Sequence, residues 1–138
     1  FELCGKTVVT VGCGSVGSEC ARRYKALGCR VLGVDLYPTE NELYEKIYPL
    51  SVLPSVLSIS DAVILTLPLT DETRGLFDGE MLSHMKNTAV LINISRGAVV
   101  DEDALTAALS EKKLYGAVLD VFESEPLSQD SPLWDMSL

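Results

Sequence analysis

The stretch that decides the fold is Val8-Val9-Thr10-Val11-Gly12-Cys13-Gly14-Ser15-Val16-Gly17. An apolar strand here breaks into G-x-G-x-x-G and opens a helix, which is the pattern of a βα turn that binds a dinucleotide. The three glycines have different roles, since Gly12 permits the tight turn, Gly14 lets a pyrophosphate approach the backbone, and Gly17 lets the helix lie close to the strand. The phosphates would then meet free N–H groups at the positive dipole end of the helix.

An acidic residue, Asp35, follows the glycines at the spacing that this motif requires. It ends a second apolar run, residues 30–34, and an acid about 20 residues after the glycines accepts hydrogen bonds from the ribose hydroxyls. Its charge repels a 2′-phosphate, so the sequence predicts NAD rather than NADP as the cofactor. A glycine-rich turn without a ligand is the alternative, but here the strand, the helix and the acid are all in place.

The composition suits one globular domain. Of the 138 residues, 47% are hydrophobic and 22% are charged, which is ordinary for a chain that folds around one core. The formal net charge of −9, with 11 scattered basic residues, argues against a nucleic-acid surface, which needs clustered Lys and Arg. We also expect no membrane span, because no apolar run reaches the roughly 18 residues that a span requires.

The cysteines favour a reducing compartment. Cys4, Cys13, Cys20 and Cys29 form no C-x-x-C pair, so neither a metal site nor a disulfide framework is expected. Reduced thiols, and a start that lacks the basic-then-apolar pattern of a signal segment, predict a cytoplasmic protein.

Apolar runs and helical spacings alternate along the chain. This alternation predicts a single α/β domain with a doubly wound parallel sheet, a Rossmann-like fold. Gly28 stands where a helix C-cap glycine belongs, and a short helix is expected in the polar segment around residues 42–46. Strands are expected at residues 7–11, 30–34, 62–67, 89–93 and 115–119, and the other helices at residues 15–27, 53–59, 79–85 and 101–109.

Two strand ends carry residues that suit a site, since ligands bind at the carboxyl ends of strands in such sheets. After residues 62–66, Pro68 removes a backbone donor and fixes the turn that follows Leu67; an ordinary strand-end turn is the alternative. After residues 91–92, Arg96 offers the side chain best shaped to hold a carboxylate; a surface salt bridge is the alternative.

A third strand end, after residues 115–119, carries three acids, Asp120, Glu123 and Glu125. Loop carboxylates are ordinarily solvated, because charged side chains stay in water unless they are paired. We keep that interpretation for Glu123, and we treat Asp120 and Glu125 as candidates for the site.

Four ordered motifs together resemble a known family. They are G-x-G-x-x-G, then Leu67-Pro68-Leu69-Thr70-Asp71-Glu72-Thr73, then Asn93-Ile94-Ser95-Arg96-Gly97-Ala98-Val99-Val100-Asp101-Glu102, then Leu119-Asp120-Val121-Phe122 with Glu125-Pro126. Their order, over almost the whole chain, resembles the NAD-dependent D-isomer-specific 2-hydroxyacid dehydrogenases, the group that contains D-3-phosphoglycerate dehydrogenase. The resemblance strengthens Arg96 and Glu125 as candidates for catalysis.

The resemblance implies roles at matching positions. In the family, the arginine at Arg96 clamps the substrate carboxylate and polarises its 2-oxo group, while the glutamate at Glu125 pairs with a histidine that takes the hydroxyl proton. A carboxylate beside an imidazole orients it and raises its pKa, which suits an acid/base group near neutral pH. The implied cofactor contacts are Gly12, Gly14 and Gly17 with the backbone of Ser15 and Val16 at the pyrophosphate, Asp35 at the adenosine ribose, Leu67 and Pro68 along the cofactor, Ile94, Ser95 and Arg96 on the nicotinamide side, and Asp120 at the carboxamide.

Two departures from the family limit these implications. The family often has a basic residue where this chain has Ser15, so phosphate binding is expected to depend more on the helix end. The family's histidine comes shortly after the sequence corresponding to Ser131-Pro132-Leu133-Trp134-Asp135, whereas the single histidine here, His84, is expected on a helix and partly exposed. We therefore expect residues 1–138 to be an NAD-binding domain, truncated before the catalytic histidine and without the substrate domain.

The resemblance implies an oxidoreductase that moves a hydride between nicotinamide and a D-2-hydroxy acid or 2-oxo acid. The partners expected are that small molecule and a second copy in a homodimer, and the chain alone is expected to be inactive. A non-enzymatic, NAD-sensing, corepressor-like module is the alternative. An unrelated Rossmann enzyme, of the alanine or adenosylhomocysteine type, fits poorly with the motifs at Arg96 and Glu125-Pro126. Which 2-hydroxy acid is used stays open.

Overall fold

A parallel sheet forms the centre of the fold in a computed structural model that describes residues 2–136. Within those residues, six strands form one sheet in the order β3-β2-β1-β4-β5-β6, and each neighbouring pair is parallel. This doubly wound order reverses between β1 and β4 and confirms the predicted Rossmann-like fold. The strands are β1 (Thr7–Val11), β2 (Arg30–Asp35), β3 (Lys46–Pro49), β4 (Ala62–Leu65), β5 (Val90–Asn93) and β6 (Gly116–Leu119), and the helices are α1 (Ser15–Ala26), α2 (Leu53–Leu57), α3 (Gly79–Ser83) and α4 (Glu102–Ser110).

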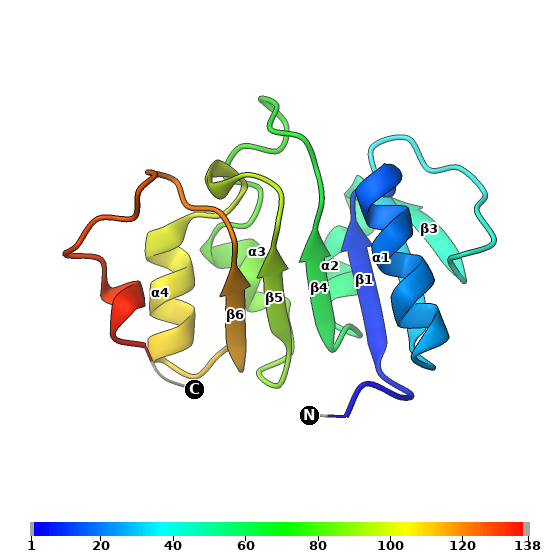
Figure 1. Ribbon diagram of the computed structural model, residues 1–138, viewed down its shortest axis with the longest axis horizontal. Helices are drawn as coiled ribbons and strands as arrows, with labels where there is room; N and C mark the ends of the chain where they lie inside the picture. The colour runs from blue at the N-terminus through cyan, green and yellow to red at the C-terminus, as the bar shows by residue number, and fades with distance from the viewer. Residues whose placement is uncertain (1, 137–138) are drawn as a thin grey trace.

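Helices cover both faces of the sheet, and this explains the apolar runs of its central strands. Val9 of β1 belongs to a core shared with Leu57 of α2 and Leu105 of α4. Its neighbour Val8 points to the opposite face and packs with Ala21 of α1. In Figure 1, α1 accordingly lies in front of the sheet, with α2 and α3 behind it. A strand covered on both faces has no position for a solvated side chain.

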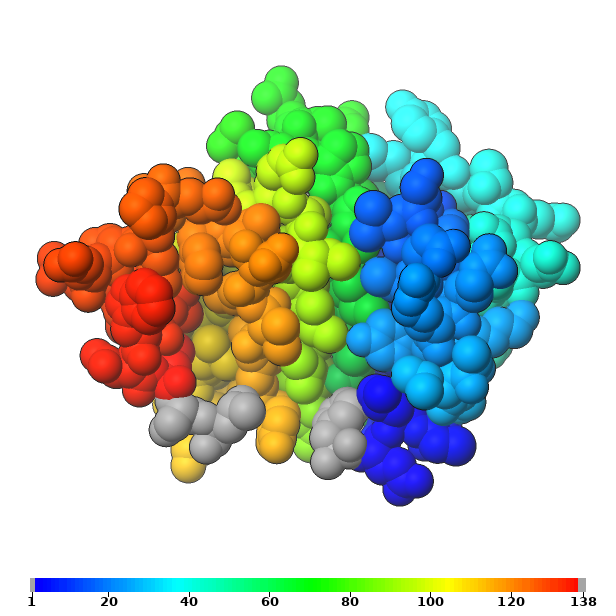
Figure 2. Space-filling model, viewed as in Figure 1, coloured from blue at the N-terminus to red at the C-terminus, as the bar shows by residue number. Residues whose placement is uncertain are grey.

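The front of the sheet is open toward its β6 edge. Val118 of β6 is 55% exposed, and in Figure 2 the segments of β5 and β6 lie in view beside α1. The sheet is therefore most deeply buried around β1 and β4. The glycine turn follows β1 and lies beside the end of β4, so it is attached to this buried part of the sheet.

The predicted helix at residues 42–46 is wrong. The chain turns there and then forms β3, which pairs with the edge of β2. Tyr44 is 6% exposed and accepts a 3.0 Å hydrogen bond from the Thr10 hydroxyl, so this segment bends inward to place an aromatic ring. Pairing with an existing strand edge outweighs local helix preference, because tertiary contacts routinely override propensity.

Two further features of the structure are the state of its cysteines and the length of its helices. Cys4, Cys13, Cys20 and Cys29 are all free thiols. Over residues 2–136, every helix falls short of the length and apolarity needed to cross a membrane.

Candidate dinucleotide and substrate site

The site residues predicted from the sequence lie in a row along one edge of the sheet. They follow the carboxyl ends of the strands, which point upward in Figure 1. In the order of the sheet, the row runs from Asp35 at β2, through the glycine turn after β1, to Leu67 and Pro68 after β4, residues 94–96 after β5, and residues 120–125 after β6. One edge of a doubly wound sheet thus holds all the candidates, at the place where such sheets bind ligands.

The three glycines of the turn meet different surroundings. Gly12 has φ +102°, and a Cβ on it would lie 2.8 Å from the Thr66 carbonyl carbon. A Cβ on Gly17 would lie 2.1 Å from the Gly12 carbonyl oxygen, whereas one on Gly14 would meet no atom within 4 Å. Gly12 and Gly17 are therefore required by the packing of the protein itself. Gly14 faces open space, where a ligand could approach the backbone.

The N-terminus of α1 is left without a side-chain cap. Its N-cap is Gly14, no side chain accepts a hydrogen bond there, and the first turn carries no acid. In contrast, Asp78 and Asp101 cap α3 and α4. Ser15 and Val16 are exposed beside this end. The uncapped N–H groups and the helix dipole suit a phosphate, so this chain fits a dinucleotide even without a basic residue at Ser15.

Asp35 holds the glycine turn as well as facing the row. One carboxylate oxygen accepts a 2.7 Å hydrogen bond from the Cys13 N–H, and the other accepts one of 3.0 Å from the Tyr37 N–H. Burial raises the pKa of the Cys13 thiol, and the nearby Asp35 carboxylate raises it further. The thiol is therefore neutral at pH 7 and adds no negative charge where a pyrophosphate would lie.

Thr66 is a structural residue that the sequence interpretation missed. Its hydroxyl donates a 2.7 Å hydrogen bond to the Gly12 carbonyl, which fixes the glycine turn to the end of β4. The next residue, Leu67, is 3% exposed, while Pro68 is exposed and its carbonyl accepts a 2.6 Å bond from the Thr73 hydroxyl. A threonine at the end of an apolar strand is the sequence feature that could have predicted this hydrogen bond.

Asn93 opens the third motif of the sequence, and it has a structural role that the motif alone does not reveal. It is 1% exposed, and its side-chain oxygen accepts hydrogen bonds from the N–H and the hydroxyl of Ser95, at 3.0 and 2.8 Å. Its amide nitrogen donates to the Arg96 carbonyl, and its own carbonyl accepts from Asp120 N–H. This one amide therefore sets the path of the chain around Arg96, while Ile94 is 36% exposed above it.

The Arg96 guanidinium is exposed and available. It donates a 2.8 Å bond to the Ser95 carbonyl, and it takes part in none of the salt bridges among the described residues. The surface salt bridge considered from the sequence is therefore absent from this part of the chain. The side chain keeps most of its donors for an anion at the sheet edge.

The loop after β6 lies directly against the loop that carries Arg96. A Cβ on Gly97 would lie 1.9 Å from the Phe122 carbonyl carbon, so the two backbones touch there. The Glu125 carboxylate accepts a 3.1 Å bond from the Phe122 N–H, and the exposed Asp120 sits at the start of the loop. The structure thus brings the segments of Arg96 and Glu125 together, although they are far apart in the sequence.

The structure agrees with the solvated interpretation of Glu123 and adds a structural contact to it. Its side chain is exposed, but one carboxylate oxygen accepts a 2.9 Å hydrogen bond from the Glu102 N–H at the start of α4. Helices leave their first N–H groups without partners, and a carboxylate from another segment can satisfy one of them. The sequence gives no signal for such a contact between distant segments.

His84 lies away from the row. It is the exposed C-cap residue of α3 and precedes β5, so it belongs to the opposite edge of the sheet from Arg96 and Glu125. Among residues 2–136, no group of three or more His, Cys, Asp or Glu could hold a metal ion.

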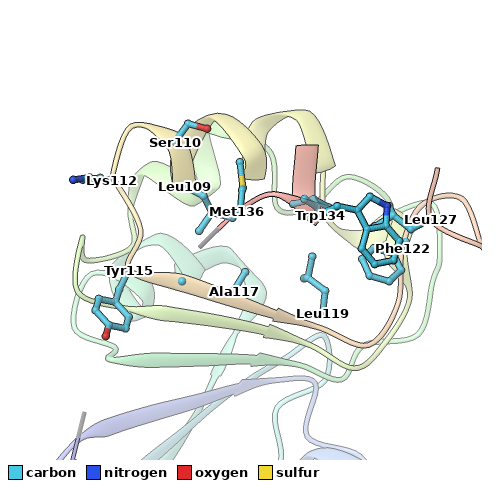
Figure 3. Close-up of a pocket in the computed structure, with 12 residues that line it drawn as sticks. Leu109, Ser110, Lys112, Tyr115, Ala117, Leu119, Phe122, Leu127, Trp134 and Met136 are labelled. Carbon is cyan, nitrogen blue, oxygen red and sulfur yellow. The ribbon is translucent and has the colours of Figure 1, made fainter. Parts of the chain in front are cut away.

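An apolar cavity of about 440 Å³ opens elsewhere, between α4, β6 and the C-terminal segment. Figure 3 shows Trp134 and Phe122 at one end of it and Tyr115 at the other. None of the predicted site residues lines this cavity. The groups able to bind a dinucleotide or a carboxylate lie along the carboxyl edge of the sheet instead.

The fold and this edge define a Rossmann dinucleotide-binding domain. The family described as "D-isomer specific 2-hydroxyacid dehydrogenase, NAD binding domain" matches residues 1–137. The chain therefore belongs to the D-isomer-specific 2-hydroxyacid dehydrogenase family, as its NAD-binding domain, and the family resemblance seen in the sequence is confirmed.

Individual relatives agree with this assignment. The chain is 44% identical over 135 residues to a glyoxylate reductase from Korarchaeum cryptofilum, covering 96% of this chain and 40% of that protein. A phosphoglycerate dehydrogenase structure from Lactobacillus plantarum superposes with a TM-score of 0.94 at 34% identity, over 99% of this chain and 44% of that one. A D-isomer-specific 2-hydroxyacid dehydrogenase from Xanthobacter autotrophicus, solved with NADPH and MES, gives 0.91 at 42% identity, over 95% and 42%.

The chain thus spans less than half the length of these relatives. All three are named as dehydrogenases or reductases, so nothing in them favours the corepressor-like alternative. The family assignment also excludes an unrelated Rossmann enzyme.

Proposed function

We propose that this chain holds NAD for a protein that interconverts D-2-hydroxy acids and 2-oxo acids. The observation that carries the proposal is the single row of candidate groups, with an uncapped helix end after β1 and, after β5, an arginine that takes part in none of the salt bridges among residues 2–136. A dinucleotide laid along such an edge would place its phosphates at α1 and its nicotinamide toward β5 and β6. The bound cofactor supplies the hydride chemistry.

The half of the row around β1 and β2 holds the cofactor. Backbone N–H groups at Ser15 and Val16 bind the pyrophosphate, Gly14 gives it room, and Asp35 accepts bonds from the adenosine ribose. The charge of Asp35 is the reason that we propose NAD rather than NADP, although the Xanthobacter relative was solved with NADPH. Leu67 and Pro68 form the wall of the cofactor site at β4.

The half of the row around β5 and β6 handles the substrate end. Ile94 and Ser95 lie beside the nicotinamide, and Asp120 holds its carboxamide. Arg96 binds the carboxylate of a 2-oxo acid with two parallel hydrogen bonds and polarises the neighbouring carbonyl. Glu125 orients an imidazole that exchanges the hydroxyl proton.

This chain spans less than half the length of its relatives, and we propose that the imidazole and the rest of the substrate site lie outside the segment that it matches. We propose glyoxylate and related small 2-oxo acids as substrates, because the Korarchaeum relative is a glyoxylate reductase. A cytoplasmic location and a homodimer complete the proposal: free thiols support the first, and the family resemblance supports the second. Sedimentation of the purified protein tests the homodimer.

A thermal melt of the chain in the presence of NADH tests the proposed cofactor role. Ligand at about 100 times its dissociation constant adds about 2.7 kcal/mol to the free energy of unfolding, so the melting temperature should rise with NADH. Adenosine serves as the control, because it lacks the pyrophosphate that α1 is proposed to bind. An unchanged melt at millimolar NADH would contradict the proposal.

A further inference from the structure

Glu102 and Glu123 hold each other's backbone. The Glu123 carboxylate accepts a 2.9 Å hydrogen bond from the Glu102 N–H, and the Glu102 carboxylate accepts one from the Glu123 N–H. We call this reciprocal pair of bonds the Glu102–Glu123 clamp. It joins the first residue of α4 to the loop after β6, across 21 residues of sequence.

The clamp lies beside the contact between the two loops of the substrate end. Gly97 follows Arg96 directly, and a Cβ on Gly97 would lie 1.9 Å from the Phe122 carbonyl carbon and 2.4 Å from the Glu123 nitrogen. That same Glu123 nitrogen donates to Glu102. The backbone contact and the clamp therefore share Glu123, and together they fix one loop against the other.

The loop that the clamp holds also carries Glu125. The Glu125 carboxylate accepts a hydrogen bond from the Phe122 N–H, at 3.1 Å, so its direction depends on where Phe122 is held. The backbone of Arg96 is held from the other side by Asn93, whose side chain donates to the Arg96 carbonyl at 3.0 Å. Each of the two groups is thus tied to its own loop, and the relative position of the loops depends on the clamp and on Gly97.

We propose that Glu102 and Glu123 are positioning residues that set the distance between Arg96 and Glu125 in the dehydrogenase reaction. This inference rests on the function proposed above for those two groups. Both clamp residues use their carboxylates to accept hydrogen bonds from backbone N–H groups. They affect the rate through the position of Arg96 and Glu125, since a shift of about 1 Å between reacting groups can slow a reaction by about a hundredfold.

The chemistry of the clamp explains why glutamate suits both positions. The N–H of Glu102 is among the first of α4, and such N–H groups have no partner within the helix. A carboxylate is the acceptor preferred there, because the helix N-terminus carries partial positive charge. Asp101 already caps the Ala104 N–H, so Glu123 supplies an acceptor for a donor that the local cap leaves free.

The test uses the full-length protein, with NADH and glyoxylate as substrates. Glu123→Ala removes one bond of the clamp and frees the loop, so kcat/KM for glyoxylate should fall by about tenfold to a hundredfold. The KM for NADH should stay within about twofold, because the cofactor end of the row is untouched. Glu123→Gln keeps an oxygen acceptor for the Glu102 N–H and should recover most of the activity. The matched control is Glu111→Ala at the other end of α4, which should leave both constants unchanged.

The outcomes separate this inference from the proposed function. If the wild-type protein does not reduce glyoxylate, the proposed function fails and this inference fails with it. If the wild-type protein is active and Glu123→Ala, folded as judged by its melt with NADH, keeps its kcat and its KM for glyoxylate, this inference alone is overturned. Glu102→Ala serves as the second variant should Glu123→Ala fold poorly. If Glu123→Ala lost NADH affinity by the same factor as glyoxylate turnover, this inference would also be overturned. A general structural defect would then explain both losses.

Discussion

Gly14 and Gly17 are alike in the sequence motif, but their surroundings predict opposite effects of the same substitution. A Cβ on Gly17 would lie 2.1 Å from the Gly12 carbonyl oxygen, so Gly17→Ala should lower the free energy of unfolding by about 3 kcal/mol or more, the upper end of overpacking costs. Gly14 has φ −75° and free space, so Gly14→Ala should change stability by less than about 1 kcal/mol. Its methyl group should still weaken NADH binding by about tenfold, or about 1.4 kcal/mol. Urea unfolding and NADH fluorescence titration measure the two effects, and a stable Gly17→Ala variant would contradict this assignment.

Asp35 should set the choice between NADH and NADPH. We expect the wild-type chain to prefer NADH, because a carboxylate near a 2′-phosphate costs about 1 to 4 kcal/mol, depending on the local dielectric. Asp35→Ala should narrow the preference, but it also removes the acceptor for Cys13 and Tyr37. Asp35→Asn removes the charge but keeps only one of the two acceptor oxygens. The ratio of the NADH and NADPH dissociation constants within each variant reports the effect of the charge, because loss of a hydrogen bond in the glycine turn weakens both cofactors. Equal dissociation constants for NADH and NADPH in the wild-type chain, measured by fluorescence, would end the proposed role of Asp35.

Among the helices and strands, the sequence predicted those whose position depends on a local pattern of residues. The glycine motif and the apolar runs located β1, α1, β2 and β4, because burial on both faces leaves a continuous apolar signature. The segment at residues 42–46 was misassigned because its structure depends on Tyr44 reaching Thr10 and on β3 joining β2. Those contacts come from other parts of the chain, so no local pattern reports them.

Asp61 ties together elements at the other edge of the sheet and should make stability depend on pH. Its carboxylate accepts bonds from the Thr7 N–H of β1 at 2.9 Å and from the Lys86 ammonium at 3.0 Å. Burial alone would raise the pKa of Asp61, but these two partners outweigh it and the pKa is lowered from its ordinary 3.8. A lowered pKa stabilises the fold above pH 3.8, and this contribution is lost as the pH falls through the lowered value.

Asp61→Asn should therefore lower the free energy of unfolding by about 1 to 3 kcal/mol at neutral pH, the range for hydrogen bonds to a charged group. The difference from the wild-type chain should shrink below pH 3.8, where the wild-type carboxyl group becomes protonated too. Urea unfolding at a series of pH values checks this. Asp71→Asn, in an exposed turn, is the control, and a deficit independent of pH would count against the ionic role.

Across the whole molecule, the sequence supplied candidate residues for the site but could not give the contacts among them. Strand ends in a parallel sheet meet at one edge, so Asp35, Arg96 and Glu125 could be placed there from their positions after apolar runs. The backbone contact of Gly97 with Phe122 and the role of Glu123 depend on how two loops pack in three dimensions. Solvation is the ordinary state of a loop acid, and only the folded chain brings the α4 N-terminus to Glu123.

The position of the single histidine leads us to expect that the chain binds the cofactor without turning over a substrate. The 138-residue chain carries one histidine, and His84 lies at the end of α3, at the opposite edge of the sheet from Arg96 and Glu125. We therefore expect this chain to bind NADH and to leave glyoxylate unreduced, because no imidazole within it can give a proton to a substrate held by Arg96. NADH fluorescence followed over time after glyoxylate is added measures this, with the full-length protein as the positive control. Steady NADH oxidation by the chain that disappears in His84→Gln would show that a histidine reaches the row after all.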